Sequence, residues 1–352
     1  MPSTSNMTLD DAFALARDAL VNQGFSLDQA GAISETVTAA ERDGCQSHGL
    51  FRIPFYVKAL QNPSCRPDAE PQVSVGASAV INVDAGNGFC PLALKRGLEP
   101  LIERTRTHGI GALAIHKVYN IAALWPEVEH LAEEGLVAMA FTAATSTVAP
   151  AGGIRPLFGT NPMAFAWPRH GHPPLVFDQA SSASARGEIQ LRLRDGETLP
   201  DGWAIDKDGQ PTNDPAAALA GAQLPFGGHK GSSLALMVEL LAGALLGDLF
   251  SFEATEADTH KTGSPFGGEL VLAIDPSHFA PEKTTPGGSI EAQTRHAEQL
   301  FERILAQEGT RLPSDRRYRA RQETASQGIE VDSELLRTVR DYRDNPTQRS
   351  AR

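Results

Sequence analysis

The 352-residue sequence predicts an α/β fold with more than one lobe. A single hydrophobic core usually supports no more than about 250–300 residues, so a longer chain is expected to divide. Residues 111–142 predict a strand, a loop, a helix and a second strand, which is a βαβ-like unit. No G-x-G-x-x-G occurs, and residues 109–114, which match its looser form ending in Ala, lead into a strand instead of following one. A standard dinucleotide-binding Rossmann domain is therefore not expected.

N-terminal capping residues and C-terminal glycines predict where the helices begin and end. Thr8 and Ser26 each begin a capping-box pattern, and Gly109 follows the expected end of a later helix. Pro54 is expected to kink or divide the third helical stretch. The expected helices cover residues 8–22, 26–44, 47–62, 91–107, 122–134, 234–246, 290–307 and 332–343.

Short apolar runs bounded by turn residues predict the strands. They are expected at residues 79–84, 111–115, 136–142, 162–167, 175–178 and 268–275. The polar stretch 196–223 is expected to form a long surface excursion. This order predicts a helical N-terminal region (1–70) packed with helices at 315–345, an α/β region (71–135), an α/β lobe (136–310) and a disordered tail (345–352).

Composition restricts the class of protein. The formal net charge of −12 favours solubility and disfavours a general nucleic-acid binder. Three cysteines, Cys45, Cys65 and Cys90, are unpaired by spacing and suggest a reducing compartment. No signal peptide is visible, and the most apolar segment, 234–249, is too short and too interrupted to span a bilayer. We expect a cytoplasmic protein with no membrane partner and no metal, because no second ligand pair accompanies Cys45 and His48.

Residues 47–52 place a hydroxyl, an imidazole and a guanidinium close together. If this segment is helical, His48 and Arg52 share a face. A titratable imidazole beside a fixed cation suits a site that holds a carboxylate and delivers a proton next to it. The simpler interpretation is that Ser47 caps a helix and His48 is a partly buried structural histidine.

Three other stretches carry candidate chemistry, each with a simpler alternative. Residues 227–233 place glycines, Lys230 and hydroxyls before an apolar helix, which suits an anion or is merely a glycine-rich turn. The arginines of residues 311–317 suit a phosphate or form a solvated basic face. Asp178 and Glu188 could orient a histidine, or be a strand-end aspartate and an exposed helix glutamate.

Short motifs spread from about residue 8 to residue 331 resemble one family in their order and spacing. They are Ser47-His48-Gly49 with Phe51-Arg52, Ala123-Leu124-Trp125-Pro126-Glu127, Pro156-Leu157-Phe158-Gly159-Thr160-Asn161-Pro162, Phe177-Asp178, Leu224-Pro225-Phe226-Gly227-Gly228-His229-Lys230-Gly231 and Arg311-Leu312-Pro313. The sequence is similar to the malate/L-lactate dehydrogenase-like oxidoreductases. The likeness is closest to their cyclic-ketimine branch, the Δ1-piperideine-2-carboxylate and Δ1-pyrroline-2-carboxylate reductases.

The resemblance implies a non-Rossmann NAD(P)-binding fold, with a mixed sheet and surrounding helices, in a homodimer that binds NADPH between lobes, NADH being an alternative cofactor. It implies that His48 is the proton donor, Ser47 and Glu188 are its relay partners, and Arg52 and Thr160 contact the substrate. The implied cofactor contacts are Asn120, Ile121, Ala122, Ala123, Leu124, Asp178, Gln179, Ala180, His229, Lys230, Arg311, Arg316 and Arg317.

The implied reaction reduces Δ1-pyrroline-2-carboxylate to L-proline, or Δ1-piperideine-2-carboxylate to L-pipecolate. It needs a cation for the carboxylate, a hydride donor facing C2 and an acid near nitrogen, which Arg52, NADPH and His48 would supply. Relatives often carry one or two histidines in the loop before residue 123. This chain has Asn120 and Ile121 where the resemblance would place a His-Phe pair, so we expect an altered or narrowed substrate range.

Three alternatives remain open at the level of sequence. The same residues would serve a 2-oxo-acid reductase of the malate or lactate type. A hydrolase using Ser47, His48 and Glu188 is disfavoured because adjacent side chains diverge on a helix and no G-x-S-x-G occurs. A relative that binds the cofactor without turnover is the third.

Overall fold

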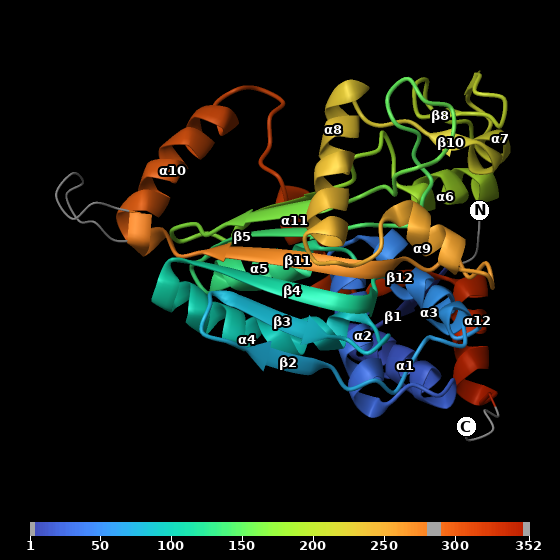
Figure 1. The fold of residues 1–352 in the computed structure, drawn as a ribbon, viewed down its shortest axis with the longest axis horizontal. Helices are drawn as coiled ribbons and strands as arrows, with labels where there is room; N and C mark the ends of the chain where they lie inside the picture. Colours follow the sequence, from blue (N-terminus) through green and yellow to red (C-terminus); the bar gives the residue numbers. More distant parts are fainter. Residues whose placement is uncertain (1–3, 280–289, 348–352) are drawn as a thin grey trace.

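A seven-stranded mixed sheet forms the centre of the computed structural model, which describes residues 4–279 and 290–347 (Figure 1). The strand order is β2 (Gln72–Val75), β3 (Val80–Asp84), β4 (Ile110–Tyr119), β11 (Phe266–Ile274), β5 (Val137–Thr142), β6 (Met163–Trp167) and β7 (Leu175–Gln179). Neighbouring strands are antiparallel except β3 and β4, which are parallel. The predicted α/β fold with a mixed sheet is confirmed.

The predicted βαβ-like unit is present with one strand inserted. It consists of β4, α5 (Trp125–Glu133) and β5. Both strands pair with β11 in antiparallel fashion, so β4 and β5 are parallel to each other with β11 between them. The boundary expected between residues 135 and 136 therefore falls inside this unit, between α5 and β5.

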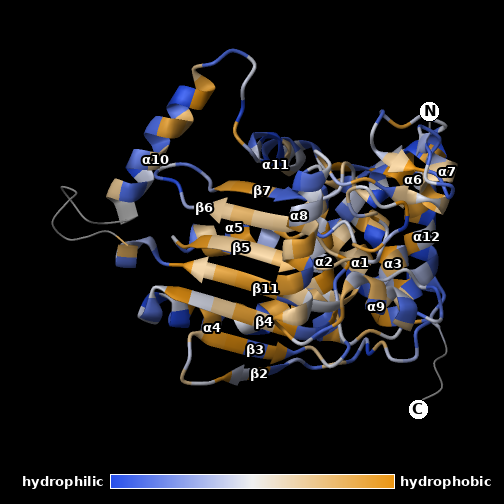
Figure 2. Ribbon diagram, turned by 45° about the horizontal axis from the view of Figure 1, so that its top comes forward, coloured by the Kyte–Doolittle hydropathy of each residue, from blue (hydrophilic) through white to orange (hydrophobic). Residues whose placement is uncertain are grey.

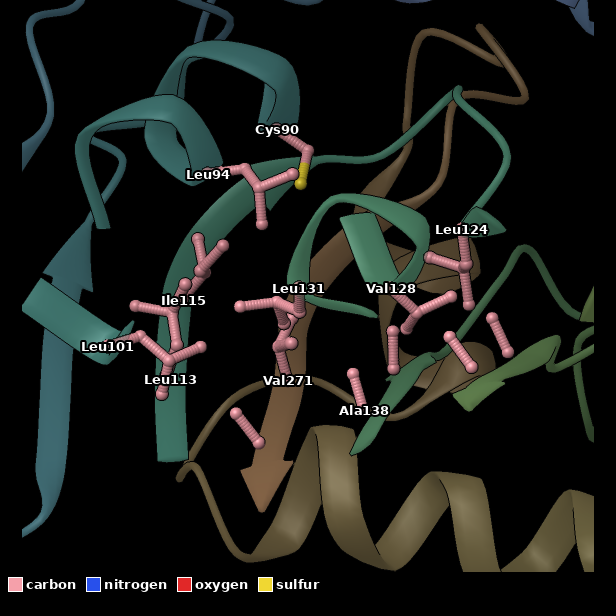
Figure 3. Close-up of a cluster of buried hydrophobic side chains, with 14 of the residues drawn as sticks. Cys90, Leu94, Leu101, Leu113, Ile115, Leu124, Val128, Leu131, Ala138 and Val271 are labelled. Carbon is pink, nitrogen blue, oxygen red and sulfur yellow. The ribbon is translucent and has the colours of Figure 1, made fainter. Parts of the chain in front are cut away.

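Helices cover both faces of this sheet, because side chains alternate along each strand. Leu113 and Val271 point toward α4 (Cys90–His108) and α5 in the largest apolar cluster, part of which is labelled in Figure 3. Leu270 and Leu272 point to the opposite face, beneath α8 (His229–Val238) and the π-helical segment Glu239–Ala244. Figure 2 shows the resulting apolar strands with more polar helices around them.

A helical region lies at one end of the sheet. It contains α1 (Leu9–Asn22), α2 (Leu27–Arg42), α3 (Ile53–Ala59), α11 (Asp315–Gln327) and α12 (Ser333–Asp344). There α12 packs along α1, and β1 (Thr4–Met7) pairs with β12 (Ile329–Asp332), so the two ends of the chain meet. Thr347 donates its backbone N–H to the carbonyl of Asn22 over 3.2 Å. Residues 348–352 of the expected tail lie outside the described residues.

The remaining elements surround the sheet. The expected surface excursion contains a small sheet of β8 (Ala204–Ile205), β9 (Pro211–Thr212) and β10 (Ala222–Gln223) with α7 (Pro215–Ala220), and it packs beside α6 (Arg186–Asp195). The helix α9 (Ser251–Ala257) lies near the start of β11 (Figure 1). The helix α10 (Ile290–Leu305) projects beyond the sheet in the same view, with Phe301 packed in a cluster with Leu175 of β7. Among the described residues, no helix combines the length and apolar character needed to cross a membrane.

The prediction of one helix over residues 47–62 is wrong for the first half of this range. The segment forms two 3₁₀ turns, Gln46–His48 and Leu50–Arg52, before α3 begins at Ile53. Pro54 lies in the first turn of α3, where its missing N–H costs no helical hydrogen bond. The stretch is therefore divided just before Pro54, one of the two expected outcomes, and is not kinked there.

Three element boundaries also differ from the prediction. The strand β4 continues to Tyr119 because β11 pairs with it along this length. The helix α5 starts at Trp125, not at residue 122. The helix α8 starts at His229, directly after two glycines with φ of 56° and 62° that turn the chain.

Candidate active site

A cavity of about 800 Å³ lies between the helical region and the sheet. It is lined by the 3₁₀ turns, the loop 120–124, the ends of β5 and β7, and the start of the C-terminal arginine run. The predicted site residues that line it are Ser47, His48, Arg52, Asn120, Ile121, Ala122, Ala123, Leu124, Thr160, Asp178, Gln179, Ala180, Arg311, Arg316 and Arg317. Segments far apart in the sequence thus meet in one space, of a size typical of a cofactor or substrate site.

The imidazole of His48 is held between a hydroxyl and a guanidinium. Arg52 Nη2 donates to His48 Nε2 over 3.3 Å, because a guanidinium has no lone pair to accept with. A neutral ring that accepts at Nε2 carries its proton on Nδ1, which then donates to Ser47 Oγ at 3.1 Å. Ser47 and Arg52 therefore fix both the tautomer and the plane of His48.

Glu41 holds this segment in its conformation, a role that no sequence motif indicates. Its carboxylate Oε1 accepts the backbone N–H of Leu50 over 2.7 Å and so caps the second 3₁₀ turn. A Cβ at position 49 would lie 2.0 Å from the same oxygen, so Gly49 is required by the approach of Glu41. Burial raises the pKa of Glu41 to about 7.

The protonation state of His48 follows from its surroundings. Burial, and then the positive charge of Arg52, lower its pKa to about 3. Without an anion in the cavity the ring is therefore neutral at physiological pH. An anion that paired with Arg52 would offset the second of these causes.

Arg52 is a cation without an acidic partner. Among the described residues it forms no ion pair, and its buried Nε atom has no hydrogen-bond partner. Its guanidinium lies 5.3 Å from the ring centroid of Phe55, and burial lowers its pKa. A buried charge needs a partner, so the cavity is suited to an anionic ligand at this point.

Asp178 holds the loop 120–124 rather than a histidine. Its Oδ2 accepts the backbone N–H groups of Leu124 (2.8 Å) and Trp125 (3.1 Å). These groups begin α5, where the helix dipole favours a negative charge. Burial nevertheless raises the pKa of Asp178 to about 6.

Trp125 connects the histidine to α11. Its ring lies edge-on to His48, with centroids 6.5 Å apart, and its Nε1 donates to Asp43 over 3.2 Å. Asp43 in turn accepts from Arg321, which also binds Glu129. Asp43 and Glu129 were not among the predicted site residues, and the motif that contains Trp125 did not indicate these bonds, because they join distant segments of the chain.

The arginines between residues 311 and 321 differ in their surroundings. Arg311 and Arg316 are exposed where they line the cavity. Arg317 is partly buried, lies 5.1 Å from the centroid of the Trp125 ring, and has a buried Nη1 atom without a partner. Arg321 instead belongs to the ionic network of Asp43.

Three predicted site residues are not brought to the cavity. Glu188 lies on α6 with 47% of its side chain exposed, and its ion-pair partner is Arg192 at 3.7 Å. His229 and Lys230 are exposed at the start of α8 and do not line the cavity. Their helix begins five residues earlier than expected, which directs its first turn to the surface.

Thr160 lines the cavity from a turn that buried side chains hold in place. The adjacent Asn161, with φ of 40°, accepts from the backbone N–H of Ala144 and donates to Glu239 over 2.8 Å. Glu239 lies in the π-helical segment, a conformation that often occurs near functional sites.

Comparisons with known proteins agree with this arrangement. Residues 7–340 match the malate/L-lactate dehydrogenase family. The chain is 47% identical over 336 residues to a Δ(1)-pyrroline-2-carboxylate reductase of Ancylobacter novellus, covering 96% of this chain and 97% of the relative. It is 48% identical over 333 residues to a Δ(1)-pyrroline-2-carboxylate/Δ(1)-piperideine-2-carboxylate reductase of Pseudomonas aeruginosa, covering 95% and 98%.

A solved structure shows the same fold. The crystal structure of Δ1-piperideine-2-carboxylate reductase from Pseudomonas syringae pvar. tomato superposes with a TM-score of 0.88 at 40% identity, covering 96% of this chain and all of the other. The resemblance inferred from the short motifs is confirmed over nearly the whole chain. This chain belongs to the malate/L-lactate dehydrogenase family.

Proposed function

We propose that this protein is an NADPH-dependent reductase of cyclic ketimine carboxylates, acting on Δ1-pyrroline-2-carboxylate, Δ1-piperideine-2-carboxylate or both. The observation that carries the proposal is Arg52, a cation without an acidic partner beside the neutral His48 in the large cavity. The relatives' names point to the same substrates.

Residues of the cavity fit a phosphorylated nicotinamide cofactor. Arg311 and Arg316 are exposed where they line it, and the unpartnered Nη1 of Arg317 leaves a donor for an anionic oxygen. Forked guanidinium groups suit phosphate, and their number favours NADPH over NADH. When bound, the cofactor supplies the hydride that adds to C2 of the imine.

The chain's own residues would bind the substrate and deliver a proton. Arg52 would turn from His48 Nε2 to the substrate carboxylate in a charge-assisted pair. The added negative charge raises the pKa of His48, so the ring takes up a proton and can give it to the imine nitrogen. Ser47 would hold Nδ1 during this change. The product is the cyclic amino acid, and His48 returns to its neutral form.

A side-by-side assay tests this function. Purified protein would be offered NADPH or NADH with each cyclic imine, pyruvate and oxaloacetate. Turnover of the cyclic imines with NADPH supports the proposal. Turnover of the 2-oxo acids instead would place the protein among the hydroxy-acid dehydrogenases. Cofactor binding without turnover of any substrate would indicate that the protein binds the cofactor but does not catalyse these reactions.

We also propose a homodimer in the cytoplasm. Leu236, Leu240 and Leu245, along α8 and the segment that follows it, are 48%, 50% and 66% exposed, and a second copy of the chain would bury them. The three cysteines are free thiols, in keeping with a reducing compartment. Light scattering on wild type and Leu240→Glu tests the dimer, which the substitution should dissociate.

A further inference from the structure

Two buried carboxylates lie directly behind the loop 120–124. Glu127 of α5 and Glu269 of β11 are only 4% and 0% exposed. With the thiol of Cys90, which is 1% exposed, they form a group whose oxygen and sulfur atoms lie within 4.8 Å of one another. The catalytic proposal above uses none of these three side chains.

No cation compensates the pair. Among the described residues, neither carboxylate forms an ion pair with Lys, Arg or His. The other titratable groups that face Glu127 are acidic or neutral, namely Asp178 of β7 and Tyr56 of α3. Two adjacent negative charges in a buried site without a cation would cost too much free energy, so the pair must hold a proton.

Hydrogen bonds indicate which carboxylate is the anion. Cys90 Sγ donates to Glu269 Oε2 over 3.0 Å, and the Nδ2 group of Asn120 donates to the same oxygen. Glu127 is also hydrogen-bonded to Glu269, and two carboxyl groups can bond only if one is protonated. Three donors thus converge on Glu269, so the proton belongs to Glu127.

The backbone is arranged to present Glu269. The pairing of β11 with β4 shifts register between Gly267 and Glu269, a bulge that redirects the following side chain. Thr142 Oγ1 donates to the carbonyl of Gly268 over 3.1 Å and holds the bulge.

Glu269 fixes the loop through Asn120. The side-chain oxygen of Asn120 accepts the backbone N–H of Ala122 over 3.2 Å, while its Nδ2 is bound to Glu269. The amide is therefore committed at both ends to the shape of the loop.

We propose that Glu127 and Glu269 form an acid pair with one proton, in which neutral Glu127 supports the Glu269 anion and Glu269 is the positioning residue that holds Asn120 and the loop 120–124. This inference rests on the proposed binding of NADPH at that loop. The pair then places one negative charge, not two, behind the cofactor site.

Two isosteric substitutions separate the roles. Glu127→Gln keeps a donor toward Glu269, so the Kd for NADPH, measured by nucleotide fluorescence, should stay within about threefold of wild type. Glu269→Gln places an NH₂ donor where other donors already point and should weaken NADPH binding roughly 10-fold or more. Equal effects of the two variants, or the reverse order, would overturn the assignment.

A rescue variant distinguishes positioning from general damage. Asn120→Asp combined with Glu269→Gln exchanges donor and acceptor, while the Asp oxygen still accepts from Ala122. The double variant should recover most of the NADPH affinity lost in Glu269→Gln. Failure to recover, or stoichiometric zinc bound by wild type and lost in both single variants, would contradict the acid pair.

An infrared measurement tests the proton independently of NADPH. At about pH 8.5, where Glu41 and Asp178, with pKa values of about 7 and 6, are ionised, wild type should keep a protonated-carboxyl band that Glu127→Gln lacks. Persistence of that band in Glu127→Gln would refute the pair. If wild type bound no NADPH while the band behaved as expected, only the proposed function would fail.

Discussion

The guanidinium of Arg52 donates to Nε2 of His48 across 3.3 Å, so the protein's own cation holds the imidazole in its neutral form. A general acid that starts neutral must gain its proton when the substrate arrives. The pairing therefore makes the acid available only when an anion has displaced Arg52, which links proton delivery to correct binding.

Binding of a substrate-like anion should take up protons. Pyrrole-2-carboxylate, a planar analogue that cannot be reduced in the same way, should raise the pKa of His48 from its low value of about 3 and cause uptake of as much as about one proton per site near pH 7. Calorimetry in buffers of different ionisation enthalpy measures this uptake. It should vanish in His48→Asn, and a wild-type enthalpy independent of buffer would contradict the mechanism.

Arg52→Lys should lose the forked contact with the carboxylate. Charge-assisted hydrogen bonds contribute about 1.5–3 kcal/mol, so kcat/KM should fall roughly 10- to 150-fold, mostly through KM. The Kd for NADPH should not change. Arg104→Lys, a partly exposed position outside the cavity, is the matched control. An unchanged KM in Arg52→Lys would remove this residue from the substrate site.

His48→Asn should lower kcat by roughly 100- to 10,000-fold, the usual contribution of a general acid. NADPH should still bind, because Asn leaves the backbone of the 3₁₀ turn unchanged. His130→Asn, on the exposed side of α5, serves as the control and should retain full turnover. A His48→Asn protein that reduced the imine within threefold of the wild-type rate would rule out this proton donor.

Glu41 should make stability fall as pH rises. Its pKa is about 7 in the folded protein and 4.5 for a solvated glutamate side chain. The neutral form therefore stabilises the folded protein below pH 4.5, and this stabilisation is lost as pH rises through 7. Glu41→Gln keeps the acceptor for Leu50 without the charge. Between about pH 5 and 8 the variant should gain roughly 2–3 kcal/mol in unfolding free energy relative to wild type.

Denaturant unfolding at several pH values measures this difference. The exposed Glu103→Gln variant provides the control and should parallel wild type throughout. A constant gap between Glu41→Gln and wild type would mean that Glu41 does not titrate in this range.

Local signals predicted much of the fold. Thr8 and Ser26 cap α1 and α2 as expected, because a capping hydrogen bond depends on residues three apart. The stretch after Ser47 could not be predicted in the same way. Its 3₁₀ turns depend on the buried Glu41 carboxylate, which a helical pattern does not reveal.

Long-range pairing explains the other differences. Tyr119 extends β4 because it pairs with Phe266, which lies far along the chain, whereas the polar His116 and Lys117 suggested a loop. Asp178 was predicted to be a site residue and lines the cavity, yet its hydrogen bonds to α5 are visible only in three dimensions. The acid pair of Glu127 and Glu269 could not be predicted either, because it joins a helix to a strand across 142 positions (269 − 127).

The most direct measurement is the fate of the hydride. Wild-type protein would be incubated with Δ1-pyrroline-2-carboxylate and NADPH doubly deuterated at C4 of the nicotinamide, and the product analysed by mass spectrometry and chiral chromatography. The account predicts L-proline with one deuterium at C2, formed by wild type and almost absent with His48→Asn. Absence of labelled proline, with deuterium appearing instead in lactate or malate from parallel reactions, would contradict it.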